Sequence, residues 1–256
     1  MKIGLALSGG AARGIAHLGV IKALEENDIE TTMISGASAG AIIGAFYAKG
    51  YKPDEILEIF TKIKINKYLS WTFRNGGVMK LDQARPILKE NLEIDDFSGL
   101  KLPLHIVATN LRSGKPRFFN KGPLFDAILA SSVIPGLFSP IKIDGDEYID
   151  GGVVNNLPTE PLMGNCEKII GSHCNPFSEN FKSDGIKSII ERALILSVTM
   201  NIQFRKSLCD LFIEPPEMAN YSIFDTSKMQ DMYQVSYDFA SRLLESAGLS
   251  KLVLAD

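Results

Sequence analysis

The chain has 256 residues, of which 45% are hydrophobic and 22% are charged. This composition is typical of a globular protein and excludes disordered, collagen-like and coiled-coil chains. Thirty acidic and 27 basic residues give a formal net charge of -3, so the chain has no general positive charge for a nucleic-acid partner.

The simplest organisation is one α/β domain over residues 1–256. The length fits such a domain, and no repeat, low-complexity tract or charge block marks a boundary. The three cysteines form no C-x-x-C pair, which indicates reduced thiols. The first apolar run, Ile3 to Leu7, is too short for a signal peptide, and no stretch has the roughly 20 apolar residues of a spanning helix. We therefore expect a cytoplasmic protein that contacts membranes from one side at most.

Strands and helices alternate from the start of the chain. Ile3 to Leu7 forms a short apolar strand that ends in glycines, and helical spacing follows from Ala12 to Glu26. A second strand, Thr31 to Ile34, precedes a helix of small residues from Ala39 to Lys49, which Gly50 ends.

The same alternation continues to the carboxyl end. Strand patterns cover Leu104 to Thr109, Lys168 to Gly171 and Leu211 to Ile213, and helical patterns cover Pro123 to Ser132, Ile186 to Arg205 and Lys228 to Glu245. Such alternation predicts βαβ units, and hence an α/β fold whose mostly parallel sheet is covered on both faces. Because ligands bind at the carboxyl ends of such strands, we expect the turns after the first two strands to meet there.

The segment Gly36-Ala37-Ser38-Ala39-Gly40 is a G-x-S-x-G motif between a predicted strand and a predicted helix, which is the context of a nucleophile elbow. A serine on such a tight turn needs small neighbours, which explains the two glycines. The free N–H groups and positive dipole end of the following helix favour negative charge on the serine oxygen. The alternative is an N-capping serine in an ordinary glycine-rich turn.

The segment Gly9-Gly10-Ala11-Ala12-Arg13-Gly14 is a glycine-rich turn that leads into a helix. Consecutive backbone N–H groups in such a turn can face one concave spot and bind an oxyanion. A dinucleotide-binding turn is disfavoured because Ala11 stands where G-x-G-x-x-G requires glycine. A tight turn without a ligand is the remaining alternative.

Asp150-Gly151-Gly152 follows a strand-like segment, Glu147 to Ile149, and so places a carboxylate at a strand end. Asp-Gly is also common in ordinary turns.

A serine nucleophile needs a base, which is usually histidine. His17 lies in a helical pattern and His105 in a buried strand pattern, which favours packing roles for both. His173 follows a predicted strand, and the order Ser38, Asp150, His173 matches that of α/β-hydrolases. A triad through His173 stays open, although Ser38 follows the second strand, earlier than is normal in those enzymes.

The three motifs, in this order and near the amino terminus, resemble those of the patatin-like phospholipase family in its short, single-domain bacterial form. Ala130-Ser131-Ser132-x-x-Pro135-x-x-Phe138-x-Pro140 resembles another block of that family. The resemblance spans Ile3 to Pro161, and the remainder matches only in the order of strands and helices. It implies a three-layer α/β/α fold.

The resemblance also implies a serine–aspartate dyad without histidine that hydrolyses the acyl esters of lipids or phospholipids. Ser38 would form the acyl-enzyme, and Asp150 would accept its proton and later activate water. The N–H groups around Gly9, Gly10 and Ala11 would bind the oxyanion, and Arg13 would brace that loop or meet the lipid phosphate. The supporting motif residues are Gly14, Gly36, Gly40, Gly151 and Gly152.

This chemistry requires no cofactor and no metal. An acyltransferase that uses the same dyad, and a lipid-binding module without turnover, are the alternative functions.

One further segment, Ile56 to Phe73, interleaves apolar and aromatic side chains, Trp71 among them, with basic residues. Such a segment can lie in a lipid headgroup layer as a peripheral membrane contact. The other interpretation is a helix that covers the sheet.

Overall fold

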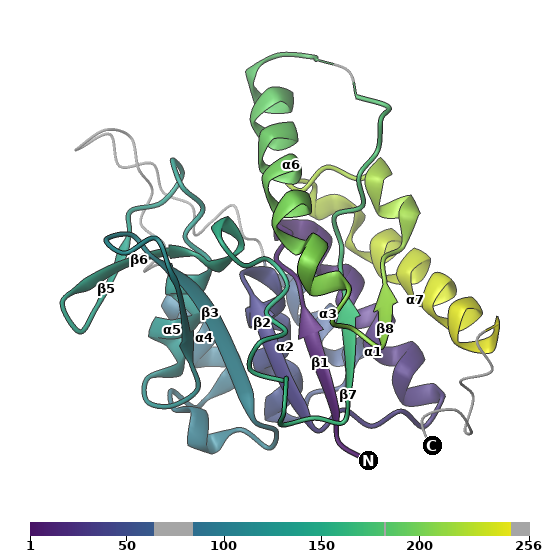
Figure 1. The fold of residues 1–256 in the computed structure, drawn as a ribbon, viewed down its shortest axis with the longest axis horizontal. Coiled ribbons are helices and arrows are strands. Elements are labelled where there is room, and N and C mark those ends of the chain that lie inside the picture. The colour runs from purple at the N-terminus through teal and green to yellow at the C-terminus, as the bar shows by residue number, and fades with distance from the viewer. Residues whose placement is uncertain (64–83, 182, 247–256) are drawn as a thin grey trace.

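The structure is a computed structural model of the chain, and it describes residues 1–63, 84–181 and 183–246 (Figure 1). Its sheet follows the order β5-β6-β3-β2-β1-β7-β8, and β4 pairs with β3. The strands are β1 (Ile3–Leu7), β2 (Met33–Ala37), β3 (Leu104–Asn110), β4 (Pro116–Phe119), β5 (Ile141–Ile143), β6 (Asp146–Asp150), β7 (Lys168–Ser172) and β8 (Leu211–Ile213).

The helices lie between these strands. They are α1 (Ala16–Glu26), α2 (Ala39–Lys49), α3 (Pro53–Lys62), α4 (Arg85–Leu92), α5 (Leu124–Ser131), α6 (Ile186–Lys206) and α7 (Met229–Ser246). The predicted first helix begins differently from expectation, because a short 3-10 helix, Ala11–Ile15, precedes α1. The second strand also lies a few residues later than predicted, because Ser35, Gly36 and Ala37 continue its pairing with β3.

The sheet is mostly parallel, as predicted. Neighbouring strands in the series β3-β2-β1-β7-β8 run parallel, whereas β4, β5 and β6 form an antiparallel edge beyond β3. The chain builds outward from β1 in both directions, with β2 and β3 on one side and β7 and β8 on the other. The carboxyl end of β1 therefore lies at the point where the strand order reverses, which is where ligands bind in such sheets.

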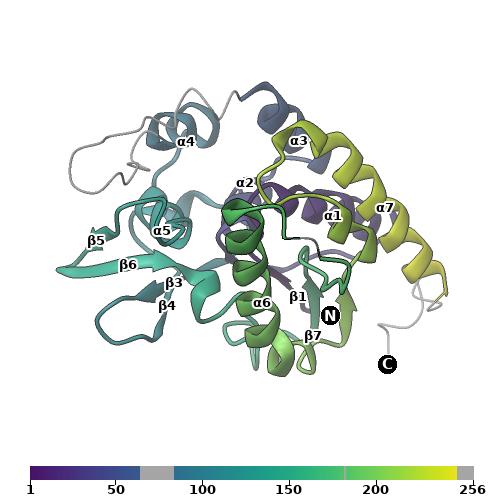
Figure 2. The ribbon, with the colours of Figure 1, turned by 90° about the horizontal axis from the view of Figure 1, so that it is seen from above.

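The two faces of the sheet bury different side chains. Alternate residues of β1, such as Leu5 and Leu7, enter the large core beneath α1, α2 and α5, whereas Ala6 enters a smaller core on the opposite face with Leu157 and Ile202. Figure 2 shows α1, α3 and α7 together on one side of the sheet, with α6 on the other. A thick helical layer and a thinner one thus enclose the sheet, which confirms the α/β fold with flanking helices.

A substitution at Gly19 probes the packing of the thick helical layer, because α7 crosses α1 at this residue. A Cβ on Gly19 would overlap the carbonyl oxygen of Tyr233 and lie 2.6 Å from the backbone nitrogen of Tyr237. Gly19→Ala is expected to lower the free energy of unfolding by about 1–3 kcal/mol through overpacking, although alanine is the better helix former. Urea denaturation of the two proteins measures the difference.

Gly44→Ala in α2 is the matched control. A Cβ there would meet side-chain methyl groups of Ile34 and Leu104 at 3.1 and 3.2 Å, and side chains can shift where backbone cannot. The loss should therefore be smaller than for Gly19→Ala. Equal losses at the two sites would show that the backbone contact between α1 and α7 is not the determining factor.

Candidate active site

Ser38 occupies the turn between β2 and α2, where the backbone adopts a conformation that is rare outside glycine. Its φ is 51° and its ψ is −119°. A Cβ on Gly36 would lie 2.5 Å from the carbonyl oxygen of Gly40, and one on Gly40 would overlap the carbonyl oxygen of Leu7. The two glycines thus let β1, β2 and the start of α2 approach closely, in the geometry of a nucleophile elbow.

Ser131, the last residue of α5, holds this turn from the side. Its hydroxyl accepts the N–H of Ser38 at 2.8 Å and donates to the carbonyl oxygen of Val107 at 2.6 Å. One buried hydroxyl therefore connects the turn to α5 and β3. Ser131 lies in the Ala130-Ser131-Ser132 block, to which the sequence assigned no chemical role.

Asp150 reaches Ser38 because of the register of the sheet. Ala37 pairs with Val107 across β2 and β3, and Ala108 pairs with Asp150 across β3 and β6. The two residues therefore lie at the same level on either side of β3. The hydroxyl of Thr109 also donates to the carbonyl oxygen of Asp150 at 2.8 Å, which fixes the end of β6.

The side chains of Ser38 and Asp150 line the same pocket, and the serine hydroxyl lies near enough to lower the pKa of the carboxyl. Oδ1 of Asp150 accepts the N–H of Gly152 at 2.8 Å. Burial raises the pKa of Asp150 to about 6, against the opposing effects of the Ser38 hydroxyl and the Gly152 N–H. The carboxylate is therefore ionised at neutral pH and has enough basicity to accept a proton.

The glycine loop after β1 lies beside Ser38, but one of its amides is already occupied. The N–H of Gly9 donates to Oδ1 of Asn156 at 3.1 Å, so it cannot serve as an oxyanion donor in this arrangement. Within the described chain, the N–H groups of Gly10 and Ala11 have no protein acceptor, and both residues line the same pocket as Ser38. Of the three backbone amides expected to bind an oxyanion, the amides of Gly10 and Ala11 therefore remain available.

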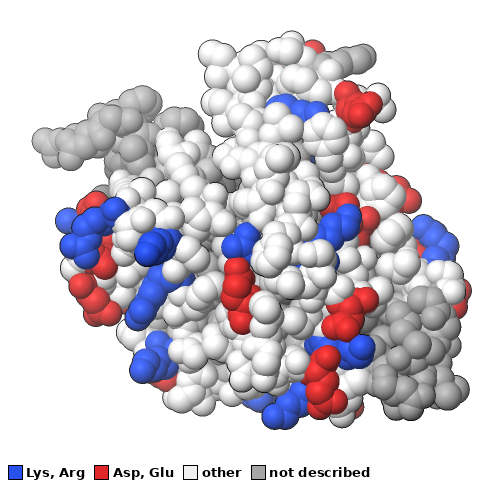
Figure 3. Space-filling view, in the orientation of Figure 1, with Lys and Arg blue, Asp and Glu red and all other residues white. Residues whose placement is uncertain are grey.

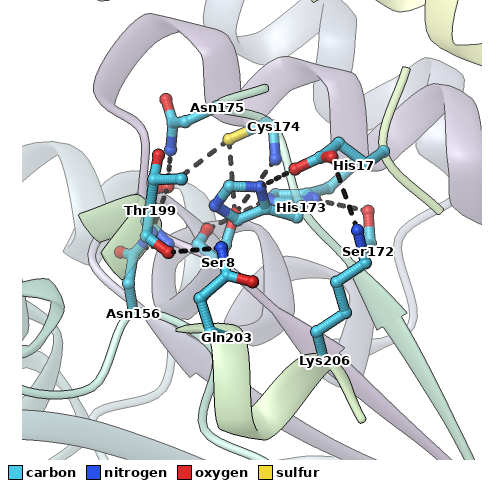
Figure 4. Close-up of polar contacts among 12 residues, drawn as sticks. Ser8, His17, Asn156, Ser172, His173, Cys174, Asn175, Thr199, Gln203 and Lys206 are labelled. Atoms are coloured by element: carbon cyan, nitrogen blue, oxygen red, sulfur yellow. Dashed lines mark hydrogen bonds and ion pairs between the residues drawn. The ribbon is translucent and has the colours of Figure 1, made fainter. Parts of the chain in front are cut away.

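Two buried asparagines hold the Gly9 peptide group from both sides (Figure 4). Asn175 donates to the carbonyl oxygen of Gly9 at 2.6 Å, and Nδ2 of Asn156 donates to the same oxygen at 3.4 Å. Asn156 in turn receives support from α6, because its N–H donates to Oδ1 of Asn201 at 3.0 Å. Sequence reasoning missed these residues, since nothing local marks an asparagine that contacts a loop about 150 positions away.

Behind the loop, His17 belongs to a buried polar network. Its Nε2 donates to the carbonyl oxygen of Ser8 at 2.8 Å, and its Nδ1 accepts from the hydroxyl of Ser172 at 2.7 Å. Burial lowers the pKa of His17 to about 4, so the ring is neutral, and only this tautomer satisfies a carbonyl acceptor. His17 thus has a structural role, as expected.

Arg13 is buried and braces the glycine loop. Its Nε donates to the carbonyl oxygen of Tyr221 at 2.7 Å, and next to it the N–H of Ala12 donates to the carbonyl oxygen of Ile223 at 2.9 Å. Of the two roles expected for Arg13, this geometry favours the brace. The remaining motif glycines serve close contacts, Gly14 against Ala39 and Gly151 against the carbonyl oxygen of Val107.

His173, the competing base, does not line the pocket that contains Ser38. It is fully buried, and its Nδ1 lies 2.6 Å from Oε1 of Glu214. The ring also stacks on Phe212 of β8. The structure therefore places His173 in a packed pair beneath the loop and brings Asp150, not His173, to Ser38.

The pocket over Ser38 is enclosed by apolar side chains. Ile134 and Pro135 line it from the segment after α5, and Leu194 and Val198 line it from α6. An acyl chain fits such a lining, and the polar groups converge at one end of it.

The segment from Ile56 to Phe73 is described only in part. Ile56 and Leu57 in α3 are buried, and Phe60 packs against the same core, so this portion covers the sheet. Trp71 and Phe73 lie in 64–83, outside the described residues, and the predicted membrane contact of this segment stays a prediction.

Comparisons with known proteins agree with the motifs. The sequence profile described as Patatin-like phospholipase matches residues 5–163. An uncharacterized NTE family protein of Mycobacterium tuberculosis is 35% identical over 166 residues, which are 64% of this chain and 46% of that protein. A lysophospholipase of Saccharomyces cerevisiae is 27% identical over 289 residues, covering 95% of this chain and 16% of the yeast protein. The chain thus spans less than half the length of these relatives.

Solved structures share the fold. The crystal structure of VipD from Legionella pneumophila matches with a TM-score of 0.66 and 17% identity, over 96% of this chain and 67% of that one. That of the type III effector protein ExoU matches with a TM-score of 0.53 and 18% identity, over 97% and 54%. Because the profile covers more than half of the sequence and the fold agrees, the chain belongs to the patatin-like phospholipase family.

Proposed function

We propose that the chain is a serine lipid acyl hydrolase, of the phospholipase A or lysophospholipase type, with Ser38 and Asp150 as its catalytic dyad. The observation that carries the proposal is the placement of Ser38, on its strained turn, and the buried carboxylate of Asp150 in one pocket. This pair lies in an apolar pocket beside two backbone amides without a protein acceptor. The names of the matched family and of the yeast relative support a lipid ester as substrate.

In the first step, Asp150 takes the hydroxyl proton as the Ser38 oxygen bonds to the ester carbonyl carbon. The N–H groups of Gly10 and Ala11 donate to the resulting oxyanion. When the tetrahedral intermediate collapses, the bond to the alcohol breaks and the alcohol leaves with the proton from Asp150. The acyl chain stays on Ser38.

Deacylation reverses these roles. Asp150 takes a proton from a water molecule, whose oxygen attacks the acyl carbon. The bond to Ser38 then breaks, the serine oxygen regains the proton from Asp150, and the fatty acid leaves. Both steps use one carboxylate as base and then as acid, for which a pKa of about 6 is suitable near neutral pH.

The dyad predicts the pattern of three single variants. Ser38→Ala and Asp150→Asn should each lower kcat/KM by about 10³-fold or more, because nucleophile and base act as a unit. His173→Asn, which keeps a polar nitrogen near Glu214, should retain most of the activity per folded molecule. Initial rates on a soluble chromogenic ester, with folding checked by circular dichroism, measure all three. A loss in His173→Asn as severe as in Asp150→Asn would replace the dyad with a triad.

The raised pKa of Asp150 predicts a pH profile. The base must be deprotonated, so kcat/KM should rise with pH through an apparent pKa of about 6 and then reach a plateau. The profile is measured on the same soluble ester, whose hydrolysis without enzyme is subtracted at each pH. A rate independent of pH between about pH 5 and about pH 8 would contradict Asp150 as the base.

The same carboxylate predicts an effect on stability that does not depend on catalysis. Its pKa is higher in the folded chain than the ordinary value of 3.8, so the folded state binds more protons and stability falls as pH rises from about 4 to about 6. Asp150→Asn removes this loss, because the amide can still accept from Gly152 and is never ionised. The variant should therefore be more stable than the parent at pH 8, by up to about 3 kcal/mol, with the difference shrinking toward pH 4.

Urea denaturation at a series of pH values tests this expectation. Asp144→Asn is the matched control, since Asp144 is an exposed turn residue before β6 whose positive φ asparagine tolerates. The control keeps Asp150 and should therefore follow the stability of the parent at every pH. If Asp150→Asn were less stable than the parent at pH 8, burial would not be destabilising the carboxylate.

A further inference from the structure

Helix α6 turns an apolar face toward solvent, whereas the apolar face of a surface helix usually packs on the protein. Its exposed apolar side chains are spaced by three, four or seven positions and so lie on one face along the helix. They are Ile186 (77% exposed), Ile189 (52%), Ile190 (52%), Leu196 (41%), Met200 (72%) and Phe204 (72%). Apart from Lys206, the last residue, no exposed side chain described on α6 carries a charge. We call these six residues the α6 outer face.

Three polar residues of α6 point the other way, toward the protein. Glu191 accepts from the N–H of Ile223 at 2.8 Å, and Asn201 donates to the carbonyl oxygen of Gly152 at 2.8 Å. Arg205 pairs with Glu160 at 2.8 Å. Since its polar groups are used for attachment, α6 leaves its apolar side in solvent, where a contiguous apolar patch indicates a partner.

The patch continues beyond the helix at its amino-terminal half. Phe177 and Phe181, 46% and 41% exposed, flank it. Both rings contact the guanidinium of Arg192, with 4.3 and 5.4 Å between the guanidinium carbon and the ring centroids. The lobe that α6 forms is mostly white in Figure 3, and most of the charged side chains of that view lie lower on the body.

The α6 outer face lies on the same helix that forms one wall of the pocket over Ser38. Leu194 and Val198 line the pocket, whereas Leu196 and Met200 between and beyond them face solvent. The two groups lie on different sides of the helix, and Ile190 of the outer face, one turn before Leu194 of the lining, is where they adjoin. A lipid acyl chain that enters from an aggregate in contact with this face would pass along apolar groups.

We propose that the α6 outer face, with Phe177 and Phe181, is a docking surface for the surface of a lipid aggregate, and that it delivers the substrate to Ser38. The proposal rests on the proposed function. A protein partner is disfavoured, because protein interfaces carry about one hydrogen bond per 100–200 Å², and among the described residues the exposed side of α6 offers Ser197 and Gln203 for this purpose. Docking would be peripheral, since within the described ranges no helix is long and apolar enough to cross a membrane.

The six residues of the α6 outer face are uncharged, which gives the proposal a specific signature. Binding should occur on vesicles of zwitterionic phosphatidylcholine and should change little with salt, because no ion pairs with headgroups are needed. Binding through a basic segment would instead require anionic lipid and weaken as salt rises. The two modes of attachment are therefore separable by lipid composition.

Binding is measured by flotation of the full chain with phosphatidylcholine vesicles at low and high salt. The chain carries Ser38→Ala, so that the vesicles are not hydrolysed during the measurement. Ile189→Glu with Met200→Glu places two charges on the α6 outer face at positions that do not line the pocket. Leu111→Glu with Met163→Glu is the matched control, because these residues are 45% and 47% exposed and belong to other surfaces. The same pairs in the active chain are assayed on vesicles and on a soluble ester.

The α6 pair should lower vesicle binding and vesicle hydrolysis by about tenfold or more, with soluble-ester hydrolysis nearly unchanged and the control pair like the parent. Full vesicle binding by the Ile189→Glu, Met200→Glu variant would overturn the proposal. If light scattering also showed that the parent is a dimer and this variant a monomer, the α6 outer face would join two copies of the chain instead. Failure of the proposed function would look different: no ester would be hydrolysed, while binding through α6 persisted.

Discussion

The site depends on a contact between two backbone segments with no side chain between them. Gly40, in the first turn of α2, faces the carbonyl oxygens of Leu7 and Ser8 at the end of β1. This contact brings the glycine loop beside Ser38, so that a Cβ on Gly9 would lie 3.0 Å from the Cβ of Ser38. The hydrogen bonds of Ser131, Asn156 and Asn175 are meaningful only because this approach has already placed the groups they hold.

Around Asp150 the described side chains and amides are neutral, which preserves the basicity of the carboxylate. A cation in contact would lower its pKa, but the groups that act on it are a hydroxyl and an amide. The nearby loop follows the same rule, since His17 is neutral and is held by a hydroxyl and a carbonyl. Arg13, the charged residue of the loop, points to the backbone of Tyr221. The same burial that raises the pKa of Asp150 is thus a cost to the folded state.

Local patterns predicted the fold well, because glycine turns, β-branched strands and helical spacing are local properties. The bounds of α2, α6, α7 and β8 agree with expectation to within a residue or two. Strand β4 was missed, since its four residues pair antiparallel with β3 and only two of them are partly buried. In the site, the Gly9 contact with Asn156 joins residues 147 positions apart, and no local signal reports such pairing. Spacing also revealed that α6 has an apolar face but not that this face points outward.

The attachment of α6 determines which movements the pocket can make. Asn201 donates to the carbonyl oxygen of Gly152 and accepts the N–H of Asn156, and Ile202 beside it is buried in the smaller core. Lifting this end of α6 would break both hydrogen bonds and release the support of the glycine loop and of the turn after Asp150. The carboxyl-terminal half of the helix therefore acts as a fixed wall and not as a hinged lid. A movement that widens the pocket must then come from the amino-terminal half of α6.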